Sequence, residues 1–473
     1  MTNTFLQNAL NTTTTANGAK TYKSSLSACL DLFSMGVSSN AKEHLILSAL
    51  AEDPVLATKV VLYLRDVRGG QGNKDIARAF HKAILSNKTA VSVANLIKIL
   101  PHLPEVGSWK DVYNLYGMNS KLDKAILNLV SEALTDGNAL AAKWFPRQSQ
   151  FHKDYAKAYA DGDMGAIRRW VTSLTSVVET AMCNKQWHTI NYEHVPSRAN
   201  LVYSKAFLRN DSSRRQDFLS KAEEGKVSIK ASTLYPHEIV HNVYDKSMEA
   251  LWKALPNYME GSEKYNILPI VDTSSSMTTS INGSSISCMT LAVALGLYVS
   301  ERNEGAYKDI VCTFHSHPTL AKIQGKTLAE RVNNTRRIPW GGDTNLQATF
   351  DMLLENSIGA TKADLPKVVL LISDMEFNSC DRNYRSNFAA IKANYTAAGL
   401  PMPVIVFWRI DVKVAQQPVT KHETGAILIN GYSPSILKSI LSMDIESLES
   451  ITPLNMMLKT VAEKYPFVDK ILG

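Results

Sequence analysis

Residues 272–276, Asp-Thr-Ser-Ser-Ser, bring a carboxylate and a run of hydroxyls directly after the short apolar run Ile-Leu-Pro-Ile-Val. They form a DxSxS pattern, in which Asp272, Ser274 and Ser276 can converge as the chain turns toward the next helix. Carboxylate and hydroxyl oxygens are hard ligands, which suit magnesium, manganese or calcium better than zinc. The pattern therefore predicts a divalent cation site, with Mg²⁺ as the expected ion and Mn²⁺ or Ca²⁺ as alternatives.

Two later segments can add ligands to this site. Thr344 follows the Gly-rich stretch Trp340-Gly341-Gly342-Asp343, a turn expected to precede a helix. Asp374 follows Ser373 at the end of the apolar run Lys-Val-Val-Leu-Leu-Ile-Ser. Open α/β sheets bind their ligands outside the carboxyl ends of the strands. We therefore expect Thr344 and Asp374 to lie beside Asp272.

The elements that must position these residues change character along the chain. After about residue 258, short apolar runs alternate with helical segments, which is typical of a doubly wound parallel sheet. Between about 26 and 252, apolar residues recur at helical spacing, with helix-start signals such as Asp53-Pro54 and Asn73. This predicts an irregular HEAT-like helical array. The expected division is a flexible arm (1–25), a helical-repeat domain (26–257), a Rossmann-type α/β domain (258–445) and a closing helix (446–473).

The cation pattern as a whole resembles the metal-ion-dependent adhesion site (MIDAS) of von Willebrand factor A domains. In that family the ion is held directly or through water, and a carboxylate from a partner typically completes its coordination. Glu376 could tune such a site from its outer shell, or be a solvated loop acid. The resemblance implies a ligand set of Asp272, Ser274, Ser276, Thr344 and Asp374.

The net charge of +7 lies entirely within residues 1–262, since the remaining chain is balanced. Such a surplus indicates either a polyanion-binding surface or a well-solvated basic surface. Arg65 and Arg68 precede Gly69 and Gly70, either of which could form a left-handed helix cap. These arginines could face a phosphate backbone, or instead pair with nearby acids or cap carbonyls. The full set of candidate RNA-binding residues is Arg65, Arg68, Lys143, Arg147, Arg168, Arg169, Arg198, Lys205 and Arg209.

Three phrases of the N-terminal half carry a second resemblance: Asn-Gly-Ala-Lys-Thr-Tyr at 17–22, Tyr-Leu-Arg-Asp-Val-Arg-Gly-Gly-Gln-Gly at 63–72, and Val-Pro-Ser-Arg at 195–198 with Lys-Ala-Phe at 205–207. They resemble a family of Ro-like proteins of viruses, fungi and plants, similar to TROVE-domain proteins. In TROVE proteins a ring of helical repeats is joined to a von Willebrand A domain. The resemblance implies that the ring binds small structured or misfolded RNA.

The basic surplus and the resemblance to TROVE proteins predict an RNA-binding protein, and the resemblance implies a monomer. The protein is expected to be non-catalytic, because the chain shows no P-loop, GxSxG elbow, HExxH or dinucleotide motif. Five scattered cysteines and the absence of a long apolar run predict a location in the cytoplasm, away from membranes. The alternative hypothesis is a protein-interaction adaptor, whose metal site captures a carboxylate of a partner protein.

Overall fold

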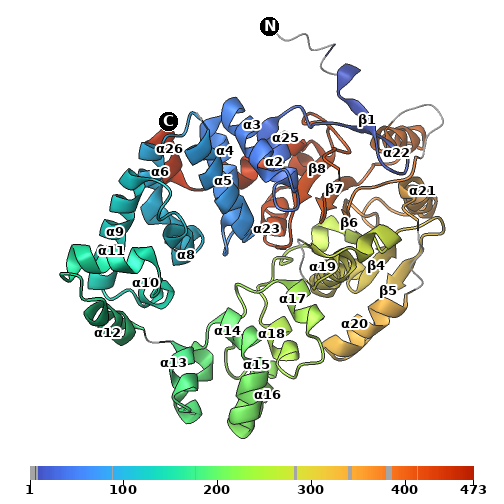
Figure 1. The fold of residues 1–473 in the computed structure, drawn as a ribbon. Coiled ribbons are helices and arrows are strands. Elements are labelled where there is room, and N and C mark those ends of the chain that lie inside the picture. The colour runs from blue at the N-terminus through green and yellow to red at the C-terminus, as the bar shows by residue number, and fades with distance from the viewer. Residues whose placement is uncertain are drawn as a thin grey trace.

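The computed structural model describes Leu6 and residues 9–87, 89–175, 177–281, 285–338, 343–379, 386–412 and 414–473. It is a mixed α/β structure, with many helices in the N-terminal part and a parallel-rich sheet in the C-terminal part (Figure 1). This agrees with the expected combination of a helical region and an α/β region. No helix among the described residues is long and apolar enough to cross a membrane.

The main sheet has six strands in the order β5-β4-β3-β6-β7-β8, and all neighbours are parallel except β4 and β5. The central strands are buried along their whole length, which explains their unbroken apolar sequences. The antiparallel edge strand β5 was not expected, because three residues give too little pattern to read. The strands are β3 (Ile267–Val271), β4 (Ile310–Thr313), β5 (Leu320–Lys322), β6 (Val368–Ser373), β7 (Val404–Arg409) and β8 (Ala426–Asn430).

The helices before the sheet follow one another in an arc that meets the sheet region at both ends (Figure 1). The first part of the arc contains α2 (Ala28–Met35), α3 (Lys42–Glu52), α4 (Pro54–Arg65), α5 (Lys74–Ser86), α6 (Val93–Ile99), α7 (Leu103–Val106), α8 (Trp109–Tyr113), α9 (Ser120–Thr135), α10 (Ala139–Trp144), α11 (Gln150–Tyr159) and α12 (Met164–Leu174). The second part contains α13 (Val178–Cys183), α14 (Ser197–Val202), α15 (Ser204–Asn210), α16 (Ser212–Glu223), α17 (Pro236–His241) and α18 (Met248–Lys253).

Asp53 and Asn73 lie at helix starts, as expected. Asp53 caps α4 by accepting from Leu56 N, with Pro54 in the first turn, and Asn73 caps α5. The helices around the sheet and at the C-terminus are α19 (Cys288–Arg302), α20 (Leu328–Arg337), α21 (Leu346–Ser357), α22 (Asn387–Ala397), α23 (Ile436–Leu441), α24 (Ile445–Glu449), α25 (Pro453–Val461) and α26 (Pro466–Leu472).

Two apolar cores divide the molecule differently from the expected sequence boundaries. One core joins α2–α5 and the helices after α12 to the sheet, so the first helices pack with the C-terminal region. For example, the backbone N–H groups of Val37 and Ser38 donate to Asn430 Oδ1, at the end of β8, at 2.9 and 3.2 Å. The other core lies within the helices from α6 to α12, with Leu62 and Val468 added from outside.

The expected flexible arm is wrong for residues 12–22. They form an antiparallel hairpin of β1 (Thr12–Thr14) and β2 (Lys20–Tyr22), in which Thr13 pairs with Thr21. Tyr22 and Gln417 also exchange backbone hydrogen bonds of 2.9 and 2.7 Å. Short polar strands of this kind gain their order from partners far along the chain, which local patterning does not reveal.

The expected single closing helix is two helices, α25 and α26. Pro466 begins α26, and Tyr465 before it has a left-handed backbone, with φ of 56°. Proline disfavours the helical conformation of the preceding residue, which explains the break. α26 then packs against α4 and α6, so the C-terminus lies beside the start of the arc (Figure 1).

We expect Val468→Ala to lower the free energy of unfolding by on the order of 2 kcal/mol, because it leaves a cavity in the α6–α12 core. The side chain of Val468 is fully buried in that core. Thermal and urea unfolding of the variant would measure the loss. Lys470→Ala, an exposed change on the same helix, is the control. Equal stability of the two variants would show that α26 does not contribute to the core.

Candidate functional site

The candidate site begins at two strand ends in the middle of the sheet. Asp272 follows β3 and Asp374 follows β6, its parallel neighbour, with Val271 opposite Ile372. The Ser373 hydroxyl donates to Asp272 Oδ2 at 2.6 Å. The strand order reverses here, with β4 and β5 on one side of the pair and β7 and β8 on the other. Such a switch point is where open α/β sheets bind their ligands.

Two serines extend the segment after β3. The backbone N–H of Ser274 donates to Asp272 Oδ1 at 2.9 Å, and the Ser274 and Ser276 hydroxyl oxygens lie 3.0 Å apart. Mg²⁺ prefers octahedral coordination at about 2.0–2.1 Å, so neighbouring ligands of one ion lie roughly 3 Å apart. The two serine oxygens therefore have the separation of adjacent ligands of a single ion.

Thr344 provides the third segment. The Trp340-Gly341-Gly342 part of the expected turn lies outside the described residues. Thr344 is only 2% exposed, and its hydroxyl donates to Glu376 O at 2.8 Å. It is thus tied to the chain immediately after Asp374. All five expected ligands lie along one edge of the sheet.

The negative charges of the two carboxylates of the site repel each other. Burial raises the pKa of Asp272 to about 6, the negative charge of Asp374 adds to the rise, and hydrogen bonds from Ser373 and Ser274 partly offset it. Arg409, at the end of β7, supplies buried positive charge to the same region. Burial lowers its pKa to about 10, and the charges of Glu376 and Asp374 oppose that shift.

The arrangement can hold a hard cation through oxygen ligands. Two carboxylates and two serine hydroxyls lie in the segments that follow β3 and β6, and the Thr344 hydroxyl is bonded to the second of these segments. A divalent ion there would offset the buried negative charge. Within the described ranges, no group of three or more His, Cys, Asp or Glu side chains is placed to hold a metal ion. The candidate cation site (Asp272, Ser274, Ser276, Thr344 and Asp374) therefore depends on its hydroxyls as well as its acids.

We expect Asp272→Asn to change how the stability of the cation-free protein depends on pH. A raised pKa in the fold means that Asp272 stabilises the fold when protonated, below about pH 4, and that this contribution is lost as pH rises through about 6. The loss is on the order of 3 kcal/mol. In chelator-treated protein at pH 7.5, the variant should be at least as stable as the wild type.

Thermal unfolding from pH 5 to 8 measures this effect, with Asp217→Asn on an exposed helix position as the matched control. The gap between the wild type and Asp272→Asn should narrow toward pH 5. A variant that is destabilised equally at every pH would contradict the expectation.

The expected RNA-binding residues are scattered over the arc. Lys143 pairs with Glu179 at 2.8 Å, and Arg147 donates to Thr175 Oγ1 at 3.4 Å. Arg169 lies 3.8 Å from Asp163, and Arg198 pairs with Glu238. The exposed members of the set are Arg68, Arg147, Arg168, Arg169, Arg198, Lys205 and Arg209.

Arg65 has a different environment from the rest. It is 4% exposed, and its Nε and Nη2 donate to Asp111 Oδ2 at 3.0 and 2.7 Å. Asp111 also accepts from Ser108 N at the start of α8. This buried ion pair joins α4 to α8. The side chain of Arg65 is therefore not part of the exposed basic surface.

We expect Arg65→Ala to destabilise the fold by about 3–5 kcal/mol, because Asp111 would remain as an unpaired buried charge. Urea unfolding would measure the loss. The double variant Arg65→Met/Asp111→Leu should recover much of the stability, since no charge is then left buried. An Arg65→Ala protein of wild-type stability would contradict the buried ion pair.

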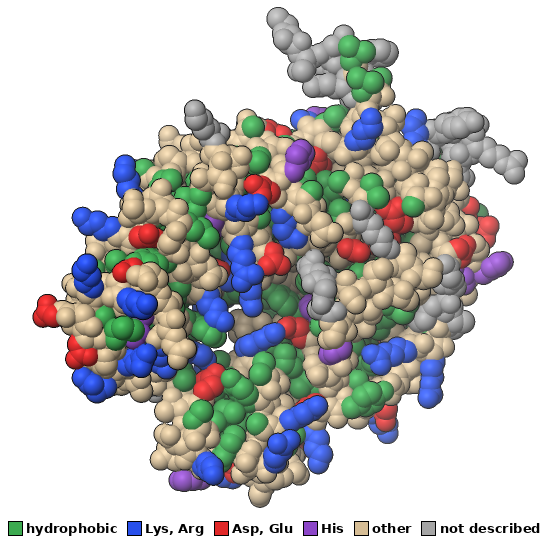
Figure 2. All heavy atoms as spheres, in the orientation of Figure 1, with side chains coloured by type: hydrophobic (Ala, Val, Ile, Leu, Met, Phe, Trp, Pro, Cys, Tyr) green, Lys and Arg blue, Asp and Glu red, His purple; other side chains and the backbone are tan. Residues whose placement is uncertain are grey.

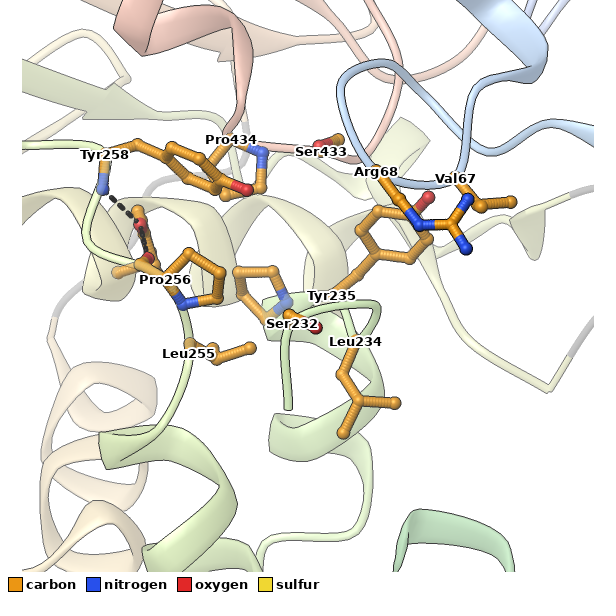
Figure 3. Close-up of a pocket in the computed structure, with 12 residues that line it drawn as sticks. Val67, Arg68, Ser232, Leu234, Tyr235, Leu255, Pro256, Tyr258, Ser433 and Pro434 are labelled. Carbon is orange, nitrogen blue, oxygen red and sulfur yellow. Dashed lines mark hydrogen bonds between the residues drawn. The ribbon is translucent and has the colours of Figure 1, made fainter. Parts of the chain in front are cut away.

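Arg68 borders a small cleft between several segments that are distant in sequence (Figure 3). Its side chain donates to Glu105 O, and the cleft is also lined by Tyr235, Tyr258 and Pro434. The cavity volume is about 10 Å³, enough for roughly one water molecule. The cleft therefore marks a junction of segments rather than a ligand pocket.

The turn beside Arg68 also corrects the expected helix cap. The left-handed residue is Gly72, with φ of 64°, rather than Gly69 or Gly70. Gly70 serves a different need, since a Cβ there would lie 1.8 Å from Tyr63 O. The pattern of glycines indicates a tight turn but does not show which one adopts the left-handed conformation.

Comparison with known proteins places the chain in a family without an assigned function. Residues 15–121 and 138–267, about half of the chain, match the family described as domain of unknown function (DUF2828), and the chain belongs to that family. Residues 266–465 match a second domain of unknown function (DUF7788). The chain is also 28% identical to uncharacterized protein L728 of Acanthamoeba polyphaga mimivirus, over 95% of this chain and 87% of the relative.

Sequence reasoning missed several residues around the site. Asn17 contacts Thr344 from the N-terminal hairpin, and Gln416 donates to Glu376 from the loop after β7. Arg409, at the end of β7, donates to Gln416 O, and its charge interacts with that of Glu376. Glu376 is buried and hydrogen bonded, so it is not a solvated loop acid. The phrase Asn-Gly-Ala-Lys-Thr-Tyr was noticed, but nothing local links it to a sheet edge more than 300 residues away.

Proposed function

We propose that this protein is a non-catalytic RNA-binding protein of the Ro type, which takes small structured or misfolded RNA. Its helical arc corresponds in this proposal to the TROVE-like part. Its sheet region corresponds to a von Willebrand A-like domain that holds Mg²⁺, or Mn²⁺ or Ca²⁺, at the candidate cation site. The strand order, with its antiparallel edge, and the 3.0 Å serine pair support the second part.

The observation that carries RNA binding is a group of like charges around an exposed aromatic ring. Lys110 Nζ lies 3.7 Å from the centroid of the Trp144 ring, and Lys143 Nζ lies 5.3 Å from it. Trp144 is 37% exposed. We call this group, completed by Lys74 and Arg78 of α5, the Trp144 cluster.

The charges of the Trp144 cluster repel one another. The pKa of Lys110 is lowered by partial burial and then by the positive charges of Lys74, Lys143 and Arg78. Lys143 and Arg78 have acidic partners, but no acidic side chain of the described residues forms an ion pair with Lys74 or Lys110. A phosphate would relieve this repulsion, and an unpaired base could stack on the indole ring.

The cluster also has a suitable place in the fold. It is built from α5, α8 and α10, and α8 lies on the inner side of the arc (Figure 1). Lys and Arg side chains gather around the hollow at the centre of the molecule (Figure 2). A single strand passing this hollow would meet both charge and an aromatic surface, which suits sequence-tolerant RNA binding.

We expect Lys74→Ala/Lys110→Ala to weaken RNA binding about tenfold and to reduce the salt slope of log K by about 1 to 2, since two phosphate contacts are lost. The measurement is a filter-binding titration of structured RNA with a single-stranded 3′ end, over a salt series. Trp144→Ala should lose affinity while keeping the wild-type salt slope, because stacking releases no counterions.

The matched control is Lys121→Ala/Lys124→Ala, which removes two exposed lysines from α9 outside the cluster. Equal losses of RNA affinity in both double variants would show that only net charge matters, and this would contradict the proposal. Binding no tighter than that of a non-specific polyanion would favour the adaptor hypothesis, in which the cation site takes a partner's carboxylate.

A further inference from the structure

The N-terminal hairpin reaches the edge of the sheet where the candidate cation site lies. The loop between β1 and β2, residues 15–19, lies against the chain that follows β6. Thr15 Oγ1 donates to Phe377 O at 2.7 Å, and Ala16 N donates to Glu376 Oε2 at 2.9 Å. Gly18 and Asn378 form an isolated antiparallel bridge. The loop is therefore fastened beside Asp374 by both backbone and side-chain bonds.

Asn17 carries this contact to an expected ligand. Its Nδ2 donates to Glu376 O at 2.7 Å and lies 3.3 Å from Thr344 Oγ1. The Thr344 hydroxyl donates to the same carbonyl oxygen, at 2.8 Å. An amide from the N-terminal hairpin thus lies directly against a hydroxyl of the candidate cation site.

A second loop connects the hairpin to the same place. Thr21 and Tyr22 bond to the backbone of Gln417, and the neighbouring Gln416 Nε2 donates to Glu376 Oε1 at 2.9 Å. Glu376 therefore accepts from the N-terminal loop with one carboxylate oxygen and from the loop after β7 with the other. The hairpin, this loop and Glu376 form a continuous layer beside Thr344 and the chain that follows Asp374.

We infer that the 15–19 loop is a built-in cover of the cation site, so that the bound cation and the docked hairpin stabilise each other. This inference rests on the proposed cation site. In the resembling family a partner's carboxylate completes the coordination, whereas here the chain's own Asn17 lies against Thr344. The cation would then act as an internal clamp that holds the N-terminal segment to the sheet. Coupling of this kind is reciprocal, so it can be measured from either side.

The first measurement is hydrogen exchange of residues 12–22 in the full-length protein, with Mg²⁺ and with chelator. Mg²⁺ should slow exchange in the hairpin as well as in residues 272–276. Calorimetric titration with Mg²⁺ measures the same coupling as a change in the affinity for the cation. Asn17→Ala should weaken Mg²⁺ binding by about fivefold or more, the lower end of ordinary coupling between sites.

A sharper variant is Asn17→Asp, which keeps the side-chain shape, removes the donor to Glu376 O and places a carboxylate against Thr344. If the loop covers the coordination edge, this change should raise the Mg²⁺ affinity several-fold and make hairpin exchange more dependent on Mg²⁺. If Asn17 only holds the loop in place, Asn17→Asp should instead lower the Mg²⁺ affinity, as Asn17→Ala does, because it loses the hydrogen bond to Glu376 O. Asn11→Asp is the matched control, since Asn11 bonds to Ser24 within the same hairpin and away from the site.

The outcomes separate this inference from the proposal on which it rests. If the wild type binds no Mg²⁺, the cation site fails and the clamp fails with it. If Mg²⁺ binds with equal affinity to the wild type, Asn17→Ala and Asn17→Asp, and hairpin exchange is unchanged, the cation site stands and the cover is overturned. The cover is supported if Mg²⁺ slows hydrogen exchange in the hairpin and if Asn17→Asp, but not Asn11→Asp, binds Mg²⁺ more tightly than the wild type.

Discussion

The turn between α4 and α5, residues 66–72, is the constraint on which the two halves of the molecule depend. On one side, the buried pair of Arg65 and Asp111 ties the end of α4 to α8 and so to the α6–α12 core. On the other side, Gln71 Oε1 accepts from Ser433 N at 3.0 Å, beside the sheet. Because these contacts use buried polar groups, each must be satisfied where it stands, which fixes the turn. The helices of the arc can vary in length and packing elsewhere because the conformation of this turn is fixed.

How far the sequence could predict the fold depended on the range of the interactions involved. The central strands were found because burial on both faces leaves an unbroken apolar run, and the ligands follow from where those strands end. The hairpin at 12–22 was missed because its partners, such as Gln417, are remote in sequence. Arg65 looked like a surface residue for the same reason, since Asp111 lies 46 positions away.

The candidate site likewise combines residues that are close in sequence with residues that are remote in sequence. Asp272, Ser274 and Ser276 sit within five residues and could be recognised together. Their surroundings come from two other segments, the end of β6 with Ser373 and Glu376 and the N-terminal hairpin with Asn17, and no local spacing encodes that assembly. Even so, it is the surroundings that set the pKa of Asp272, because burial dominates the shift. The sequence could thus nominate candidate ligands as a prediction, whereas the shifted pKa of Asp272 required the fold.

The position of α26 has a consequence for the order in which the chain is made. Val468 of α26 fills the core built by α6–α12, helices that leave the ribosome hundreds of residues earlier. During synthesis those helices must wait with one apolar face uncovered, although N-terminal units usually fold first. A chain that lacks α26 would keep that face exposed. Until α26 has been made and has docked, chaperones and proteases that recognise exposed apolar surface have a target on these helices.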